Sequence, residues 1–126
     1  MIPIFGQNKS KGYIVESGSN ANGSYIKFSD GTMICFAEVV RNIKFSQVGS
    51  VYTAETIVKV PYPQEFIETP KVIINTESAN DYSYCAIYAI LRDKKSINGV
   101  SFLRANSSGD GFTDIPFVYT AIGKWK

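Results

Sequence analysis

The stretch GSYIKFSDGTMICF, from Gly23 to Phe36, decides the fold. It places two runs that are typical of strands, SYIKF and TMICF, on either side of the dipeptide Asp30-Gly31. Asp-Gly between apolar-rich runs is a strong hairpin signal, because a type I′ turn requires a positive φ at both central positions. The sequence therefore predicts a β-hairpin with a type I′ turn. Before it, residues 17–24, SGSNANGS, are small and polar and predict a flexible loop.

The second arm of this hairpin continues as an alternating pattern. Apolar side chains recur at every second position with polar ones between them, which predicts a long strand with one buried face. Arg41 interrupts the apolar set, so we expect a bulge or a strand end there. Phe36 and Ile34 fall on the outer face, where an exposed aromatic needs a second layer or a partner chain to cover it. The apolar set is Cys35, Ala37, Val39, Ile43 and Phe45, and the polar set is Glu38, Asn42 and Lys44.

Further strand-like segments follow at short intervals, with no amphipathic helix or internal repeat. Many short strands separated by Gly/Pro turns predict an all-β fold, here an antiparallel β-sandwich of about six to eight strands. We expect one domain over residues 12–126, preceded by a lead-in segment at residues 1–11. The remaining strands are expected at 13–16, 51–60, 71–77, 84–92, 97–105 and 116–125, with a proline-bounded connection at 61–70 and a polar loop at 104–114.

Composition excludes several classes of function. The chain of 126 residues has a net charge of +2 and no histidine. Its dispersed basic residues argue against nucleic-acid binding, and the missing imidazole excludes every site that requires one. No apolar run is long enough to span a membrane, and the first residues do not resemble a signal peptide. Cys35 and Cys85 lie in apolar runs and predict two buried thiols rather than a disulfide.

No enzymatic activity, cofactor or metal is predicted. Nucleotide-binding, serine-hydrolase and zinc-protease fingerprints are all missing from the sequence. Asp81, Asp110 and Asp114 leave two alternatives open, a calcium site or a pair of catalytic carboxylates. Loop aspartates, however, usually bond their own backbone in turns.

Two polar loops carry the groups that recognise sugars. Amide, carboxylate and guanidinium groups bind vicinal hydroxyls, and an aromatic ring covers the C–H face of a sugar. Loops on a rigid scaffold often carry such binding. The alternative is that both loops are merely solvated, with Tyr84 pointing into the core. The candidate receptor-binding residues are Asn80, Asp81, Tyr82 and Tyr84 in the first loop, and Arg104, Asn106 and Asp110 in the second.

Four segments occur in an order that points to one family. They are NGSYIKFSDGTMICF, with Asn-Gly, an aromatic and Asp-Gly-Thr; VPYPQEFIETPKVIINT, with Tyr-Pro-x-x-Phe-x-x-x-Pro-x-Val; INGVSFLRA; and YTAIGKWK, with Tyr-x-Ala-Ile-Gly-x-Trp at the end of the chain. Together they cover residues 12–126. In this order they resemble the C-terminal receptor-binding tip domain of bacteriophage tail fibres.

That family is similar in turn to the H-type lectins, small β-sandwiches that form trimers and bind sugars at subunit boundaries. Pro63, Phe66, Pro70 and Val72 carry this second resemblance. The chain departs from those lectins in having no histidine and no tryptophan-centred pocket, and Phe36 stands where the tail-fibre pattern usually has Trp.

The resemblance implies a phage or prophage-derived tail fibre domain that attaches to host cell-surface carbohydrate. It implies a homotrimer joined to an upstream fibre shaft, placed at the tip of the virion and assembled in the host cytoplasm, with no nucleic-acid partner and no membrane insertion. Packing in a trimer would cover the outward Phe36. The alternative is a structural cap that trimerises and ends the fibre without binding a receptor.

Overall fold

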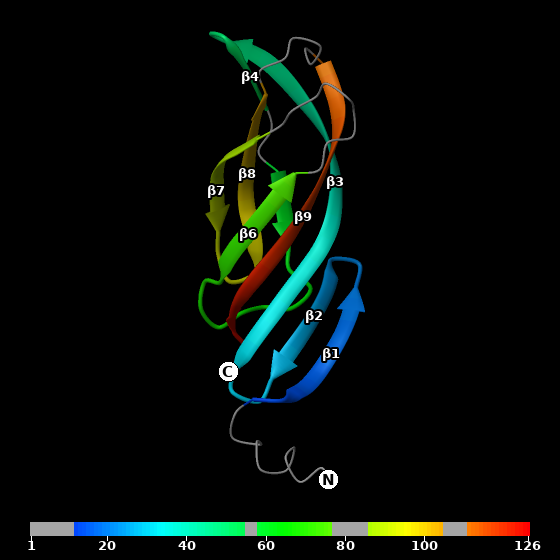
Figure 1. The fold of residues 1–126 in the computed structure, drawn as a ribbon, viewed down its shortest axis with the longest axis vertical. Helices are drawn as coiled ribbons and strands as arrows, with labels where there is room; N and C mark the ends of the chain where they lie inside the picture. The colour runs from blue at the N-terminus through cyan, green and yellow to red at the C-terminus, as the bar shows by residue number, and fades with distance from the viewer. Residues whose placement is uncertain (1–11, 55–57, 77–85, 105–110) are drawn as a thin grey trace.

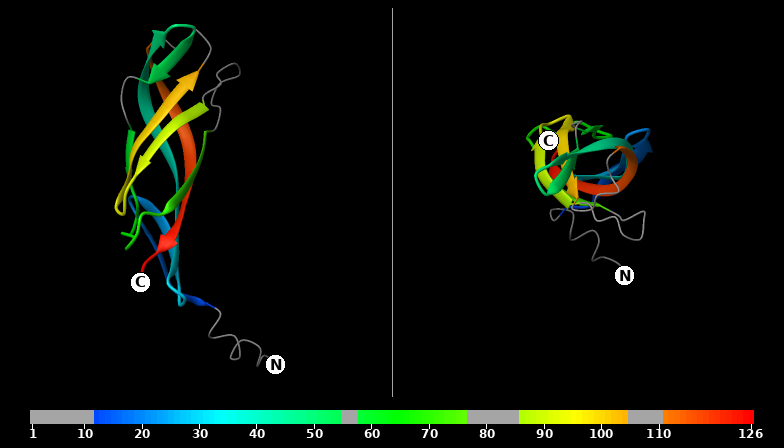
Figure 2. Two further views of the ribbon diagram at one scale, coloured as in Figure 1. Left: turned by 90° about the vertical axis from the view of Figure 1, so that its left-hand side faces the viewer. Right: turned by 90° about the horizontal axis from the view of Figure 1, so that it is seen from above.

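In the part of the chain that the structure describes, nine strands form a single antiparallel sheet that curls around its own core (Figures 1 and 2). The computed structural model describes residues 12–54, 58–76, 86–104 and 111–126. The strands are β1 (Ile14–Asn20), β2 (Gly23–Phe28), β3 (Thr32–Val48), β4 (Val51–Ala54), β5 (Val58–Pro61), β6 (Lys71–Thr76), β7 (Ala86–Arg92), β8 (Ser96–Arg104) and β9 (Gly111–Lys124). Within these ranges no helix is long and apolar enough to cross a membrane.

The prediction of an all-β, antiparallel fold is confirmed. A sandwich of two packed sheets, with about six to eight strands in total, was expected, but the described strands form one continuous sheet. β3 and β9 form a long central pair, with β2 and β1 beside one end of β3 and β6 on the other edge of β9. β3 also continues through β4 to β8, which pairs with β5 and β7. The right-hand panel of Figure 2 shows the strands curving around the long axis. Such curling follows from the twist between neighbouring strands, which accumulates along long strands.

β3 runs in register with β9 from Thr32, opposite Lys124, to Lys44, opposite Phe112. The expected bulge or strand end at Arg41 is therefore wrong. The Arg41 side chain is half-buried on the inner face, and its guanidinium donates to main-chain oxygens of Val40 at 3.3 Å and Lys59 at 3.5 Å. A long side chain can bury its stem and carry its charge to the strand edge, so the strand has no need to break.

Two polar segments differ from the sequence prediction. β1 extends to Asn20, so most of the expected loop at 17–24 is a strand paired with β2. β9 begins at Gly111, so the end of the expected loop at 104–114 is paired with β3. Neither segment shows apolar alternation in the sequence, so the pattern that indicated the other strands is missing here. Of the strand expected at 51–60, β4 and β5 cover the described residues, and residues 55–57 lie outside the described ranges.

The turn of the first hairpin is not type I′. Gly31 has a φ of +98°, and no described residue other than glycine has a positive φ. The N–H of Gly31 donates to Phe28 O at 3.0 Å, and the Asp30 carboxylate accepts from Thr32 N–H at 2.9 Å. Asp30 thus orders the turn through its side chain, a role that this residue type plays in many turns. The hairpin prediction is confirmed, and its turn type is wrong.

Trp125 fastens the end of the chain to this turn. Its main-chain N–H donates to Gly31 O at 2.9 Å, and its indole N–H donates to Phe28 O at 2.8 Å. The ammonium group of Lys27 lies 5.2 Å from the centre of the indole ring, within the range of a cation–π contact. Specific hydrogen bonds therefore join the C-terminal end of β9 to the turn between β2 and β3.

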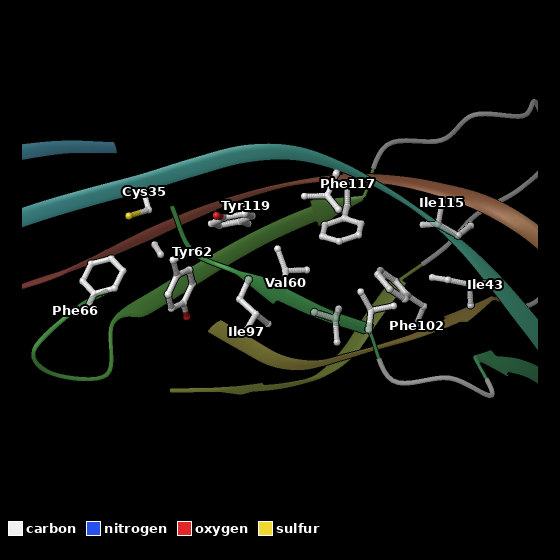
Figure 3. Packing of buried hydrophobic residues seen from close by; sticks show 14 of the residues in the cluster. Cys35, Ile43, Val60, Tyr62, Phe66, Ile97, Phe102, Ile115, Phe117 and Tyr119 are labelled. Carbon is white, nitrogen blue, oxygen red and sulfur yellow. The ribbon is translucent and has the colours of Figure 1, made fainter. Parts of the chain in front are cut away.

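The core lies inside the curl, between the β3–β9 pair and the strands β5 and β8 (Figure 3). Cys35 is fully buried and free, as predicted, and burial raises the pKa of its thiol to about 11. Cys85 lies outside the described residues. The larger buried side chains are Met33, Ile43, Phe45, Phe66, Ile97, Phe102, Phe117 and Tyr119.

The proline-bounded connection packs Phe66 against β9. A Cβ on Gly123 would lie 2.8 Å from a ring carbon of Phe66 and 3.1 Å from Cβ of Pro70. Tyr62 meets Phe66 edge to face, with ring centres 5.2 Å apart. The glycine of the final Ala-Ile-Gly motif is thus explained by close packing, since any side chain there would displace a buried ring.

Asp93 organises the turn between β7 and β8. One carboxylate oxygen accepts main-chain N–H groups of Lys95 and Ser96 at 2.8 and 2.9 Å, and the other accepts from the Asn98 amide at 2.7 Å. The Asn98 bond, followed by the two main-chain bonds, lowers the pKa of Asp93 to about 2.

We expect the Asp93 carboxylate to make stability depend on acid pH. Because its folded-state pKa is below the ordinary value of 3.8, its contribution is complete above about pH 4 and is lost as the pH falls towards 2. Asp93→Asn should lower the melting temperature at pH 7, and the gap to the parent chain should close towards pH 2. Thermal melts at several pH values measure this, and a gap that stays constant would contradict it.

Candidate functional site

The loop residues predicted to bind a receptor fall almost entirely outside the described structure. Arg104 is the last residue of β8, where its backbone pairs with Tyr52 of β4, and its side chain is not described. The structure therefore leaves this set as a prediction. Those outside the described ranges are Asn80, Asp81, Tyr82, Tyr84, Asn106 and Asp110.

Asp114, one of the three carboxylates considered for calcium or catalysis, lies in β9. Its Oδ1 accepts a hydrogen bond of 2.8 Å from the side-chain amide of Asn42 directly opposite in β3. This cross-strand pair gives the carboxylate a structural partner. Within the described ranges no group of three or more His, Cys, Asp or Glu side chains could hold a metal ion.

A pocket of about 640 Å³ lies where β2 stops following β3. We call it the β3-edge pocket. Its walls come from the β1–β2 turn at residues 20–24, residues 36–41 of β3, residues 60–61 of β5 and residues 118–120 of β9. It therefore joins four segments that are far apart in the sequence.

The strand pairing explains why the pocket forms. β2 pairs with β3 only from Met33 to Phe36, and β4 pairs with it only from Phe45 onward. Among the described residues, positions 37–41 have a ladder partner on the β9 side alone. β5 passes nearby but pairs with β8. A short stretch of β3 edge is thus left open between the β1–β2 turn and β5.

Hydrogen bonds fix the β1–β2 turn beside this open edge. The Asn20 amide donates to Pro63 O at 2.9 Å, and its Oδ1 accepts from Asn22 N–H at 2.8 Å. The buried Tyr119 hydroxyl donates a long hydrogen bond of 3.5 Å to Asn22 O. Burial raises the pKa of Tyr119, so its hydroxyl stays protonated and can donate at neutral pH. The wall formed by the turn is therefore ordered by contacts with two other parts of the chain.

The lining combines an aromatic ring with opposite charges and small polar groups. Phe36 is 40% exposed, Glu38 is exposed, and Arg41 is half-buried. Glu38 and Arg41 are the acidic and the basic residue of the lining, which also includes Asn22, Ser24 and Thr120. Binding pockets typically pair apolar surface with a few polar groups that orient the ligand.

An apolar patch adjoins the pocket on the outer face of the sheet. Phe36 of β3 and Ile73 of β6 both lie opposite Thr120 of β9, so all three point to the same side. Ile73 is 62% exposed, and Val40 and Ile122 of the same face are exposed too. We call Phe36, Val40, Ile73 and Ile122 the outer face. The prediction that Phe36 points outward is confirmed.

Sequence reasoning missed the pocket although it identified Phe36. Its walls depend on where β2 ends and on the path of β5, and neither follows from local residue patterns. Because a flexible loop was expected at 17–24, the ordered β1–β2 turn at residues 20–24 was not predicted. The pair Phe36 and Glu38 could have indicated the pocket, because it places an aromatic ring and a carboxylate side by side on the outer face of a strand.

The fold resembles that of a phage-tail-like fibre. The chain matches no protein-family model, and no curated protein is significantly similar to it in sequence. A solved structure of an N-truncated R1-type pyocin tail fibre aligns over 94% of both chains, with a TM-score of 0.55 and 14% identity. A second, of the P. aeruginosa R1 pyocin fibre, aligns with 86% of this chain, with a TM-score of 0.49 and 15% identity, and this chain spans 28% of its length. The chain therefore has a fold similar to that of an R1-type pyocin tail fibre.

Proposed function

We propose that this chain is the receptor-binding domain of a phage or prophage-derived tail fibre and attaches the particle to carbohydrate on the host cell surface. The observation that carries the proposal is the β3-edge pocket, which sets Phe36, Glu38 and Arg41 on a rigid sheet. The similarity in fold to a pyocin tail fibre supports the part of the proposal that places this chain in a fibre. In this proposal residues 12–126 form one H-type lectin-like domain at the fibre tip, residues 1–11 lead in from the shaft, and the fibre is assembled in the host cytoplasm.

Retention on cells tests the attachment function. Fluorescently labelled domain is applied to a panel of bacterial strains, with and without polysaccharide purified from the same strains. We expect retention on a subset of strains and loss of retention when the free polysaccharide is added. Absence of retention across a broad panel would contradict the proposal.

The proposal includes a homotrimer that covers Ile73 and Ile122 of the outer face and leaves Phe36 and Val40, which line the β3-edge pocket, open to ligand. Monomeric proteins rarely leave a contiguous apolar patch in water, and the outer face holds four exposed large apolar side chains on three adjacent strands. Three copies would also multiply weak sugar contacts, because linked sites raise avidity by roughly 10²–10⁴.

We expect the parent chain to have a solution mass of three times the 13.9 kDa of one chain. Ile73→Asp should lower this mass, since a carboxylate buried in the interface without a partner opposes association. Ile73 lies outside the pocket lining, so its replacement tests assembly separately from ligand binding. Leu91→Asp is the matched control, because Leu91 is 63% exposed on β7. Light scattering measures the mass, and a monomeric parent chain would contradict the trimer.

The outer face also favours the second candidate function, a structural cap that trimerises and ends the fibre. A cap predicts the same trimer and the same effect of Ile73→Asp. It differs from the receptor-binding domain in showing no retention on any strain, so the cell panel separates the two.

A further inference from the structure

We infer that the β3-edge pocket binds uncharged sugar residues, held between Glu38 and Arg41 with one face of the ring against Phe36. The inference rests on the proposed function and assigns to it a location and a ligand class. It places the binding site on strands and on the β1–β2 turn instead of the two loops at 77–84 and 104–114.

The open strand edge supplies main-chain groups that suit hydroxyls. Over the described residues 37–41, the ladder of β3 is occupied on the β9 side, while the other side faces the pocket. An unpaired edge presents N–H donors and C=O acceptors in alternation. A sugar hydroxyl can donate and accept at the same time, so a row of hydroxyls can satisfy both kinds of group.

Phe36 and Glu38 form one wall. They lie two residues apart on the outer face of β3, at roughly 6.6 Å along the strand given its rise per residue. Phe36 is 40% exposed and lines the pocket, so its ring is available to cover the apolar C–H surface of a sugar. The exposed Glu38 carboxylate is an acceptor of hydrogen bonds and can receive two from neighbouring hydroxyls.

Arg41 contributes from the inner face of the same strand. Its guanidinium has five N–H donors, and its two described hydrogen bonds, to Val40 O and Lys59 O, are long at 3.3 and 3.5 Å. Donors therefore remain for ring or glycosidic oxygens. Because Arg41 and Glu38 point to opposite faces, the two side chains enclose the strand edge from both sides. This shape suits a compact ring better than an extended peptide laid along the edge.

The charge balance selects an uncharged ligand. Glu38 and Arg41 cancel, and Glu38 is the more exposed of the two. A uronic acid or a phosphorylated sugar would bring a second negative charge beside Glu38, and like charges at close range disfavour binding. The volume of about 640 Å³ lies within the roughly 300–1,000 Å³ typical of small-ligand pockets.

The test is calorimetric titration of the whole chain with a panel of oligosaccharides, one set built of neutral hexoses and N-acetylhexosamines and the other containing uronic acids. We expect binding within the neutral set. Glu38→Gln and Phe36→Ala should each weaken it by about tenfold or more, the first by removing a charge-assisted hydrogen bond and the second by removing the ring that covers the C–H face of the sugar. The matched controls are Glu65→Gln and Tyr13→Ala, an exposed acid and an exposed aromatic outside the pocket, which should leave affinity within about twofold.

Three results would overturn the inference. Binding that is unchanged in Glu38→Gln and Phe36→Ala would place the site elsewhere while leaving cell attachment intact. Preference for the uronic-acid set would reject the ligand class. Retention on cells that survives periodate oxidation of their vicinal diols, but is abolished by protease treatment, would identify a peptide receptor. Absence of both cell retention and oligosaccharide binding would remove the proposed function itself.

Discussion

Replacing Phe117 by alanine is expected to lower the free energy of unfolding by about 3–5 kcal/mol, the range for truncating a buried phenylalanine. Phe117 in β9 is fully buried, and its ring centre lies 5.6 Å from that of Phe102 in β8, which is equally buried. In Figure 3 the two rings extend into the core from different strands and lie near each other. The pair therefore joins the central β3–β9 ribbon to the strand that curls over it. Chemical denaturation of parent and variant measures the difference.

The matched control for this loss is Leu91→Ala. Leu91 is 63% exposed, so its truncation should change stability by no more than about 0.5 kcal/mol. A loss below about 1 kcal/mol in Phe117→Ala would contradict the packing described for the core. The folded population of Phe117→Ala should keep the β1–β2 turn. This turn contacts Phe36 and the connection at Pro63 rather than Phe117.

Replacing Gly23 by alanine is expected to lower stability by about 2 kcal/mol or more and to weaken ligand binding. Gly23 has a φ of +133°, and a Cβ there would lie 2.7 Å from the main-chain oxygen of Phe36 and 2.8 Å from Cβ of Ala37. A conformation reserved for glycine costs about 1–3 kcal/mol in another residue, and the clash with backbone adds to it. Because relief requires β2 to move away from β3, the pocket wall moves with it.

Gly49→Ala is the control that distinguishes the cost of the steric clash from the cost of the positive φ. Gly49 also has a positive φ, of +64°, but a Cβ there would meet nothing within 4 Å. This variant should lose only about 1–2 kcal/mol and keep full ligand affinity. Equal losses in the two variants would show that β2 and β3 are not held as closely as described. Denaturation midpoints and calorimetry on the same samples give both readouts.

The central part of the fold follows from local patterns. The alternation from Cys35 to Phe45 identified the buried face of β3, since Cys35, Val39, Ile43 and Phe45 are buried. The hairpin at Asp30-Gly31 was also predictable, because few residue types can form such a turn. These features depend on side-chain period and turn chemistry, which a single sequence displays directly.

Other features depend on contacts between distant segments. The strand character of Ser17–Asn20 comes from pairing with β2, and that of Gly111–Asp114 from pairing with β3. Arg41 lies within a regular strand, and its guanidinium reaches a main-chain oxygen of Lys59 on a different strand. A polar sequence gives no sign of such partners. The same reasoning explains why the candidate site was sought in polar loops, while the described pocket lies at a strand edge.

The most direct test is a residue-resolved NMR titration of the isotopically labelled chain with polysaccharide fragments from a strain that retains it. We predict that the amide signals that shift belong to residues 20–24 and 36–41, on the two walls of the β3-edge pocket. Shifts confined to residues 77–84 and 104–110 would contradict the pocket and favour the polar loops. No shifts at all, with fragments from every retaining strain, would contradict recognition of carbohydrate by this domain.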